Sequence, residues 1–306
     1  MTVSIVIRTK NEEVFLPQTL ESIYSQEFRD FDVIVVDSGS SDGTLNIVRG
    51  FKSIKLVQIR SEEFTYGRAL NIGTAEAAGN VVVFLSAHAI PANDRWLSNL
   101  VGHFTDASVA GVYGKQLPHG NAYPPVRAQL LGRFKSTSQA QTSPDQHFFS
   151  NANAAIRRDV WERTPFNEEI CYCEDQMWAR TVLSLGHKIM YEPEAAVYHS
   201  HNESIRKVYQ RSRLEELGFL AIYPERQWSL TTFCNIWWRK VLRDVKFIMA
   251  NNEERKWLLI VPVYRFFEAY GFLEPHLPGV LWRPIYKRIV SFPQRLISRR
   301  KRRVIS

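Results

Sequence analysis

The first hundred residues alternate short apolar runs with segments whose apolar residues recur at helical spacing. Val and Ile dominate the runs, with almost no polar alternation, which is typical of strands covered on both faces. Helical spacing follows the first run, for example at Leu16, Leu20 and Ile23. This series predicts a parallel sheet with right-handed crossovers and a ligand crevice at the carboxyl ends of its strands. The predicted strands cover residues 3–9, 32–37, 54–59 and 80–85.

The regular pattern fails over residues 115–150, where Gly, Pro, Gln, Ser and Asn accumulate. A long irregular stretch inside a domain is typical of a binding loop or a lid. Beyond it, the periodicity predicts a helix over residues 174–185, with Gly186 as its C-terminal cap. A short strand is expected at residues 188–191.

From about Leu230 the chain changes in character. Apolar residues recur at helical spacing as far as Ile248, and Arg and Lys residues occupy the opposite side. This pattern predicts an amphipathic helical extension. We therefore expect an α/β domain over residues 1–225 and the helical extension over residues 226–306.

Net charge is unevenly distributed along the chain. Its 306 residues include 39 Lys and Arg against 31 Asp and Glu, a formal charge of +8. Eight of those cations, and no acidic residue, lie in residues 285–306, so the rest of the chain is formally neutral. This argues against a nucleic-acid-binding body, because a basic groove would be spread through the fold.

The extension combines aromatic residues such as Trp238 and Trp282 with these cations. That combination suits contact with an anionic membrane surface, and no apolar stretch reaches the roughly 18 residues that span a bilayer. We expect peripheral attachment through the 285–306 tail, at the cytoplasmic face of the membrane. A packed helical subdomain followed by a solvated tail is the structural alternative, and the two can coexist.

Composition narrows the class further. A hydrophobic fraction of 45% and 12% aromatic residues exclude wholesale disorder. The first residues lack a basic segment followed by an apolar stretch and a cleavage site, so we expect a first strand there and no secretory signal. Three cysteines provide neither a paired disulfide framework nor zinc-finger spacing, which indicates a reduced cytosolic compartment.

Polar clusters follow the predicted strands. The first strand leads into Thr9, Asn11 and Glu12, and the second leads into Asp37 and Ser38, followed by small hydroxyl and glycine residues. Backbone N–H groups at such a turn can receive a polar or anionic ligand. The alternative is an Asx turn with a helix cap. Neither the dinucleotide-binding nor the P-loop glycine pattern occurs.

Six stretches, in this order and spacing, resemble the pattern of glycosyltransferase family 2 on a GT-A fold. The resemblance covers about residues 1–205. It implies an α/β fold in which a Rossmann-like nucleotide-binding half is fused to an acceptor half, around a central and mostly parallel sheet. The stretches are VSIVIRTKNE at 3–12, IVVDSGSSDGT at 34–44, GRALNIG at 67–73, VFLSAH at 83–88, NANAAIRR at 151–158 and ED at 174–175.

The resemblance implies an enzyme that moves a sugar from a nucleoside diphosphate donor to an acceptor hydroxyl with inversion, in bacterial surface-polysaccharide assembly. A rhamnosyl or hexosyl group and a glycan or lipid-linked acceptor are the family-level expectation. Arg68 and Asn71 match contacts to the diphosphate or donor sugar, and their structural alternatives are a solvated helix face and a helix cap. The donor-site residues implied are Thr9, Asn11, Glu12, Asp37, Ser38, Arg68, Asn71, Ser86 and His88.

The family's metal-binding D-x-D motif is replaced here by Ser86-Ala87-His88. Some related transferases use D-x-H with a distant second histidine, so the resemblance implies His88 and His199 as ligands of Mn²⁺ or Mg²⁺, with His201 as the alternative. Imidazole suits Mn²⁺, whereas Mg²⁺ prefers oxygen ligands. The competing possibility is metal-independent stabilisation of the leaving group by His88 itself, by Arg68, or by a loop arginine such as Arg127 or Arg133.

The pair Glu174-Asp175 begins the predicted helix and matches the family's E-D pair, which implies Asp175 as the general base. Inverting transfer needs a carboxylate that takes the proton of the attacking hydroxyl. The alternative is that both carboxylates only complement the helix macrodipole.

Two other functions are compatible with parts of the pattern. A nucleotidyltransferase would need a Gly-rich basic loop after the first strand, and residues 8–12 do not form one. A catalytically silent protein that binds nucleotide sugars or glycans is compatible with the missing D-x-D, whereas the presence of Asp175 argues against it.

Overall fold

The structure is a computed structural model that describes residues 1–145 and 147–277. The chain forms two compact units, one made of Met1–Asn121 and Leu130–Ser200, the other of Ala122–Gln129 and the chain from His201 onward. The functional boundary expected between residues 225 and 226 stays a prediction. The basic tail at 285–306 lies outside the described residues.

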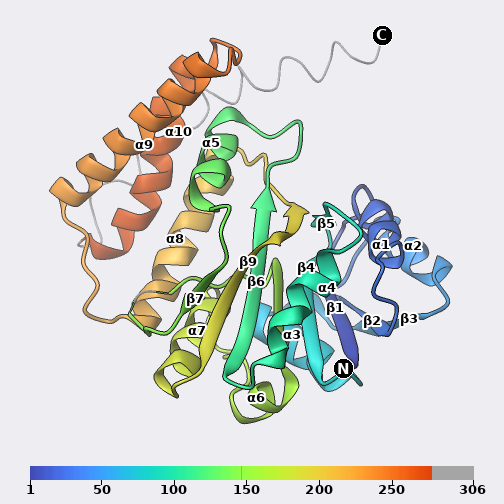
Figure 1. The fold of residues 1–306 in the computed structure, drawn as a ribbon. Helices are drawn as coiled ribbons and strands as arrows, with labels where there is room; N and C mark the ends of the chain where they lie inside the picture. The colour runs from blue at the N-terminus through green and yellow to red at the C-terminus, as the bar shows by residue number, and fades with distance from the viewer. Residues whose placement is uncertain (146, 278–306) are drawn as a thin grey trace, which may run out of the picture. The chain divides into compact units, whose positions relative to one another are not determined.

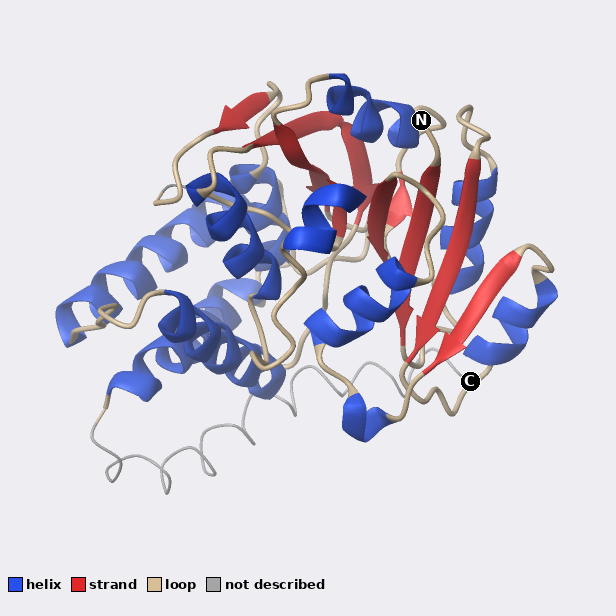
Figure 2. Cartoon of the chain, turned by 90° about the horizontal axis from the view of Figure 1, so that it is seen from below, coloured by secondary structure: helices blue, strands red, loops and turns tan. Residues whose placement is uncertain are grey.

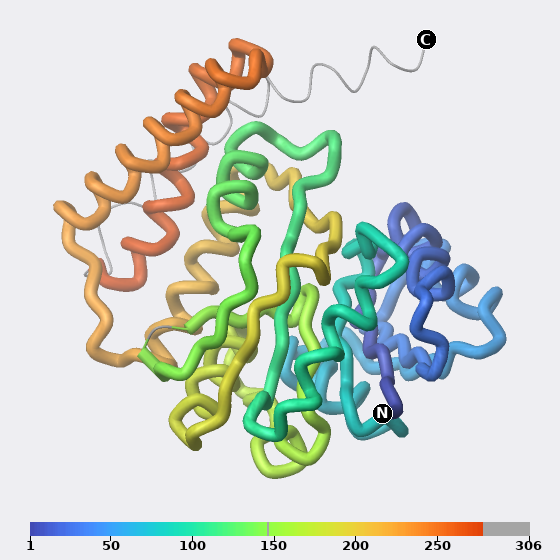
Figure 3. Tube along the Cα trace, in the orientation of Figure 1, coloured from blue at the N-terminus to red at the C-terminus, as the bar shows by residue number. Residues whose placement is uncertain are grey.

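The first unit is built on a nine-stranded sheet with the strand order β3-β2-β1-β4-β8-β6-β9-β5, and β7 is paired to β9. Figure 1 shows the sheet, with β3, β2, β1 and β4 at one side. The first four strands pair with one another in parallel. They confirm the predicted strands to within one residue at each end. Figure 3 shows β1 beside β4, although three helices and two strands separate them in sequence. The bounds are β1 Val3–Thr9, β2 Phe31–Asp37, β3 Ile54–Gln58 and β4 Val81–Ser86.

The other half of the sheet is mixed. Strand β8 is antiparallel to both β4 and β6, whereas β9 is parallel to β6. Strand β9 extends well beyond the strand expected at residues 188–191. The prediction was too short because Glu192, Pro193 and Glu194 interrupt the apolar pattern in the sequence. The bounds are β5 Ile90–Pro91, β6 Val109–Leu117, β7 Gln139–Gln141, β8 Asn153–Arg157 and β9 Lys188–Tyr198.

Helices cover both faces of this sheet, as Figure 2 shows. Ile5 and Ile7 of β1 pack with α1, α2 and α4 on one face, whereas Val6 packs with α3, α6 and α7 on the other. Period-two alternation therefore places apolar residues in two separate cores. The bounds are α1 Leu16–Tyr24, α2 Thr44–Gly50, α3 Tyr66–Ala75, α4 Trp96–Val101, α6 Arg158–Arg163 and α7 Glu174–Ser184, with 3₁₀ turns at Ser61–Glu63 and Gly102–Thr105.

The stretch predicted to be irregular contains a ten-residue helix, α5 (Pro124–Arg133), so that prediction was wrong for this part of it. Pro124 and Pro125 begin the helix, where a missing N–H is tolerated. Two consecutive prolines suggest a loop when no tertiary context is known. The predicted helix at 174–185 is confirmed by α7, which ends one residue earlier.

The second unit is helical. Its helices α8 (Ile205–Ile222), α9 (Leu230–Ala250) and α10 (Trp257–Leu273) enclose an apolar core, and a 3₁₀ turn follows at Glu274–His276. Helix α9 confirms the amphipathic helix predicted from Leu230. Gly271 allows α10 to approach α8, since a Cβ there would lie 2.6 Å from the Tyr209 carbonyl oxygen. Within the described part of the chain, no helix combines the length and apolar character needed to cross a bilayer.

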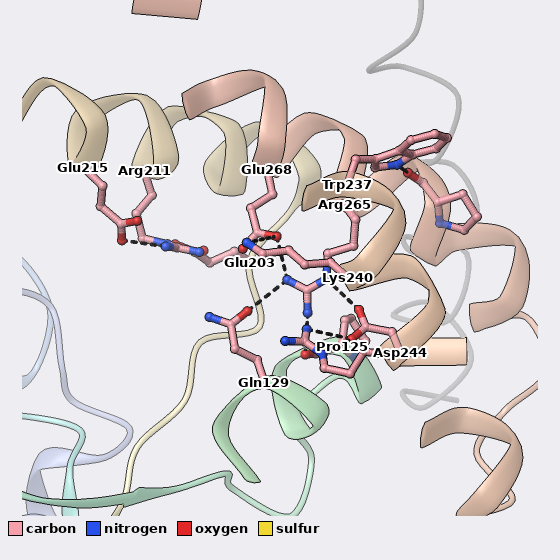
Figure 4. Close-up of polar contacts among 12 residues, drawn as sticks. Pro125, Gln129, Glu203, Arg211, Glu215, Trp237, Lys240, Asp244, Arg265 and Glu268 are labelled. Atoms are coloured by element: carbon pink, nitrogen blue, oxygen red, sulfur yellow. Dashed lines mark hydrogen bonds and ion pairs between the residues drawn. The ribbon is translucent and has the colours of Figure 1, made fainter. Parts of the chain in front are cut away.

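A buried ionic network joins the helices of this second unit (Figure 4). The guanidinium of Arg265, 1% exposed, donates to Asp244 at 2.6 Å and to Glu268 at 2.7 Å. It also donates to Gln129 at 3.0 Å and to the Pro125 carbonyl at 2.6 Å. Burial alone would raise the pKa of Glu268, but the surrounding cations, led by Arg265, hold it well below its usual range.

Candidate active site

The loops after β1 and β2 are tied together by hydrogen bonds. The Asn11 N–H donates to the Ser40 hydroxyl at 2.9 Å, and the Asn11 side-chain oxygen accepts from the Ser41 N–H at 2.8 Å. Asn11 has a φ of 55°, a left-handed conformation that Asn tolerates better than most residues. The Glu12 N–H donates to the Thr44 hydroxyl at 2.8 Å. These bonds hold the two predicted nucleotide-contacting loops against each other.

Asp37 is fully buried at the end of β2. One carboxylate oxygen accepts from the N–H groups of Gly39 and Ser40, each at 3.0 Å, and the other accepts from the Ser40 hydroxyl. The structure therefore contains the Asx turn that was the alternative interpretation of this segment. Ser38 points inward as well, and its hydroxyl donates to the Thr9 carbonyl at 3.3 Å. Asp37 and Ser38 thus shape the loop, while the Thr9 hydroxyl is buried without a hydrogen-bond partner among the described residues.

His88 and His199 come together beyond the carboxyl end of β4. Their rings stack with centroids 4.8 Å apart. The Nδ1 of His88 lies 2.8 Å from the Glu12 carboxylate and 3.5 Å from the Ser86 hydroxyl. The Nδ1 of His199 lies 2.9 Å from the side-chain amide oxygen of Gln116. Both Nδ1 atoms therefore face acceptors. In the neutral tautomer that donates from Nδ1, Nε2 carries the lone pair.

This arrangement fits a divalent cation. Each of the two histidines has a ligand nitrogen within 4.8 Å of that of the other. Metal-binding histidines usually donate their second ring N–H to a carboxylate or carbonyl, as Glu12 and Gln116 allow here. No sequence pattern pointed to Gln116. It reaches His199 because β6 and β9 pair in parallel, with Gln116 opposite Val197.

Glu174 and Asp175 lie in the first turn of α7, after Cys173 in a left-handed conformation at φ 67°. Glu174 is 5% exposed, and Asp175 keeps part of its surface exposed. Asp175 accepts from the Gln176 N–H at 2.8 Å and from the Asn151 N–H at 3.4 Å. Desolvation and the adjacent Glu174 raise the pKa of Asp175 well above that of an ordinary aspartate. A carboxylate with raised proton affinity is suited to general-base chemistry near neutral pH.

The predicted donor contacts on α3 face the loop before α7. Thr65 caps α3 by accepting from the Arg68 N–H at 3.1 Å, and the Arg68 guanidinium lies 3.3 Å from Glu168. The amide nitrogen of Asn71 donates to Glu168 and to the Phe166 carbonyl, both at 2.9 Å. Its oxygen accepts from Trp161 and from the Phe166 N–H. These four hydrogen bonds occupy both the amide nitrogen and the oxygen of the Asn71 side chain. Asn71 therefore positions the loop before α7.

The fold and this strand-end site define a glycosyltransferase with the GT-A fold. Residues 4–164 match the family described as Glycosyl transferase family 2. The O-antigen chain rhamnosyltransferase RfbN of Salmonella typhimurium is 34% identical over 220 residues, which cover 69% of this chain and 70% of that protein. The chain therefore belongs to glycosyltransferase family 2.

Further similarities agree with this assignment. The O-antigen chain rhamnosyltransferase WbaN of Salmonella anatum is 35% identical over 188 residues, which cover 58% of this chain and 59% of that protein. Among solved structures, the mannosyltransferase PcManGT of Pyrobaculum calidifontis, in complex with GDP-Man and Mn²⁺, has a TM-score of 0.57 at 20% identity. That similarity covers 97% of this chain and 81% of the mannosyltransferase, and it concerns the fold.

Proposed function

We propose that this chain is an inverting rhamnosyl- or hexosyltransferase that acts in bacterial surface-polysaccharide synthesis. Its donor is a nucleoside diphosphate sugar and its acceptor is a hydroxyl of a lipid-linked or growing glycan. The observation that carries the proposal is the Glu174–Asp175 pair at the start of α7, where Asp175 has a raised proton affinity. The identities of 34% and 35% to two O-antigen chain rhamnosyltransferases favour rhamnose as the first donor sugar to test.

The proposed reaction is a single displacement. Asp175 takes the proton of the acceptor hydroxyl as that oxygen bonds to the anomeric carbon, and the bond from this carbon to the diphosphate oxygen breaks. The nucleoside diphosphate leaves with the electron pair. Inversion follows because the hydroxyl attacks the face opposite the leaving group.

The donor site is proposed at the carboxyl ends of β1, β2 and β4. Thr9 contributes a buried hydroxyl, and Arg68 contributes a buried guanidinium Nε. Neither atom has a hydrogen-bond partner among the described residues. The loops after β1 and β2 would receive the nucleotide, and Asn71 would hold the neighbouring loop in place. The residues proposed for this site are Thr9, Asn11, Glu12, Asp37, Ser38, Arg68, Asn71, Ser86 and His88.

The direct test uses purified protein with a panel of dTDP-, UDP- and GDP-linked sugars, with and without Mn²⁺. We expect slow hydrolysis of one donor, and NMR of the released sugar should show the inverted anomer first. Tight binding of a donor without hydrolysis or transfer under any condition would instead identify a silent binding protein. Release of pyrophosphate from a nucleoside triphosphate and a sugar phosphate would identify a nucleotidyltransferase.

A divalent cation held by His88 and His199 would neutralise charge that develops on the leaving diphosphate. We propose Mn²⁺ in preference to Mg²⁺, because imidazole suits it better. His201, two residues after His199, is the proposed alternative ligand. With two neutral imidazoles and no carboxylate ligand, Mn²⁺ affinity is expected to depend on the diphosphate. Glu12 would orient His88 through the 2.8 Å contact.

Changing the metal site should weaken Mn²⁺ binding measurably. His88→Ala and His199→Ala are expected to abolish Mn²⁺ stimulation, and Glu12→Gln should weaken Mn²⁺ affinity by about 10- to 100-fold. Electron paramagnetic resonance titration of Mn²⁺ with nucleoside diphosphate present measures affinity without turnover. His187→Ala serves as the control, since His187 follows α7 away from the site. Full turnover after exhaustive chelation would show that the metal proposal is wrong.

We propose that the protein is cytoplasmic and attaches peripherally to the inner face of the cytoplasmic membrane, through the 285–306 tail. Removing residues 285–306 deletes eight cations and no acidic residue. Each cation near an anionic surface contributes on the order of 1 kcal/mol, so the truncated chain should move to the soluble fraction at physiological salt. Sedimentation with vesicles containing anionic lipid measures this. An unchanged distribution would contradict the role of the tail.

A further inference from the structure

Arg8 is a charged residue near the end of the mostly apolar strand β1, and the structure shows where it points. It lies one residue before the end of β1. Because side chains alternate along a strand, Arg8 faces the same side of the sheet as Val6, which packs with residues of α3 and α7. Its side chain is 18% exposed.

Two contacts define the environment of the Arg8 guanidinium. Its Cζ lies 4.8 Å from the ring centroid of Tyr66, the first residue of α3, which is a cation–π distance. Its Nη1 lies 3.9 Å from a Glu174 carboxylate oxygen. That Nη1 is buried and has no hydrogen-bond partner among the described residues. The Tyr66 ring therefore lies against the face of the guanidinium, and the Glu174 carboxylate lies near its Nη1.

Groups from neighbouring elements surround the carboxylate pair. Glu174 and Asp175 follow one another on α7, and Asn151 contacts both, with its amide 3.4 Å from Glu174 and its N–H 3.4 Å from Asp175. From α3 the pair is faced by Tyr66, whose hydroxyl bonds to that of Tyr172 at 3.3 Å. Arg8 on β1 supplies the positive charge that acts on Asp175.

We propose that Arg8 is a positioning residue for the base, which favours the ionised form of the Glu174–Asp175 pair and holds the pair in place through its ion pair with Glu174. This inference rests on the proposed function, in which Asp175 is the base. A role for Arg8 as a ligand of the donor diphosphate is less favourable, because a second anion on Nη1 would lie beside the Glu174 carboxylate.

Electrostatics predicts the direction in which loss of Arg8 shifts the pKa of Asp175. Desolvation and Glu174 raise the pKa of Asp175, and the positive charge of Arg8 opposes this rise. Without Arg8 the pKa of Asp175 rises further, so less of the base is deprotonated at neutral pH. The sequence signal for Arg8 was only its charge within a buried run, and its partner lies far along the chain.

The test is a pH titration of Asp175 in the full-length protein with ¹³C-labelled aspartate carboxyls, whose Asp175 signal is assigned by its loss in Asp175→Asn. In Arg8→Gln the midpoint should move up by about one pH unit. Arg8→Lys keeps the charge and should restore most of the original midpoint. Arg60→Gln is the matched control, because Arg60 is exposed and pairs with Glu63.

Turnover of the nucleotide sugar identified in the panel gives the second readout. The acidic limb of its pH profile should move with the NMR midpoint in Arg8→Gln, while donor affinity stays unchanged. An unchanged midpoint of the Asp175 titration overturns the role of Arg8 and leaves Asp175 as the base. A large loss of donor affinity, with the acidic limb of the pH profile unchanged, does the same. Full activity of Asp175→Asn would overturn the proposed base itself, so the two failures are distinguishable.

Discussion

Replacing Asp175 by Asn is expected to reduce sugar transfer by about 10²–10⁴-fold, the usual contribution of a general base. Asn has nearly the same shape, and its single side-chain oxygen can retain the 2.8 Å hydrogen bond from the Gln176 N–H. The longer 3.4 Å bond from the Asn151 N–H goes to the other carboxylate oxygen and is lost. Donor affinity should persist, because the proposed donor site is made by other elements. Initial rates with saturating donor, together with calorimetric donor binding, measure both effects.

The same variant has an expected effect on stability that separates chemistry from folding. A carboxyl whose pKa is raised in the folded state destabilises that state above the pKa of the unfolded chain, where ionisation is favoured on unfolding. Asp175→Asn removes this cost, so it should be at least as stable as the unmodified protein at pH 7. Asp159→Asn, on the exposed surface of α6, is the control and should leave turnover unchanged. Near-normal turnover in Asp175→Asn would place the base elsewhere.

The pH dependence of the unmodified enzyme follows from the same shift. Only the deprotonated form of Asp175 accepts the hydroxyl proton, so turnover falls as the pH falls through its pKa. Since desolvation and Glu174 raise that pKa, the fall should occur above the range of an ordinary aspartate. A limb near pH 4 would show that Asp175 is not the titrating group. The pH profile of kcat/KM measures it.

Local sequence patterns predicted the part of the fold that local physics determines. Strands β1, β2 and β4 are buried on both faces, so they appear as nearly continuous apolar runs whatever their neighbours are. The edge strand β3 is only partly buried. Helix α9 has one apolar side and one basic side, and its periodicity alone located it. The Glu174–Asp175 pair was identified from the family pattern, because carboxylates at the start of a helix also serve its macrodipole.

Contacts that depend on tertiary structure were not predictable. The pairing of Arg8 with Glu174 joins a strand end to a helix start far along the chain. Likewise, Gln116 reaches His199 only through the register of β6 and β9, which no local pattern encodes.

The conformation around Asp37, in contrast, is local and could be predicted. Its local Asx turn was one of two interpretations of the sequence, and the structure contains that turn.

The buried network of the second unit, in contrast, concerns stability. Arg265 lies on α10 and compensates two carboxylates that are almost fully inaccessible, Asp244 and Glu268. Lys240 also contacts Glu268, at 3.1 Å, and Arg243 contacts Asp244, at 2.7 Å. A buried pair often contributes little net stability compared with apolar residues, but removing one partner leaves an uncompensated charge in the interior.

Arg265→Leu is therefore expected to lower the free energy of unfolding by about 3–5 kcal/mol. It removes the ion pairs with Asp244 and Glu268, and also the hydrogen bonds to Gln129 and the Pro125 carbonyl. Arg265→Lys retains the charge but not the planar fork, so its loss should be smaller. Urea unfolding at pH 7, followed by tryptophan fluorescence, measures the change.

Arg239→Leu provides the matched control for this comparison, since Arg239 is exposed on α9 and surface substitutions usually change stability by less than about 0.5 kcal/mol. If the loss in Arg265→Leu arises from an unpaired buried carboxylate, it should shrink as the pH is lowered, because Glu268 can then take up a proton without its cation. The unmodified protein should show the opposite trend: the pKa of Glu268 is held low in the folded state, so acid destabilises it. A loss that does not change with pH would instead assign the effect to the missing hydrogen bonds and packing of Arg265.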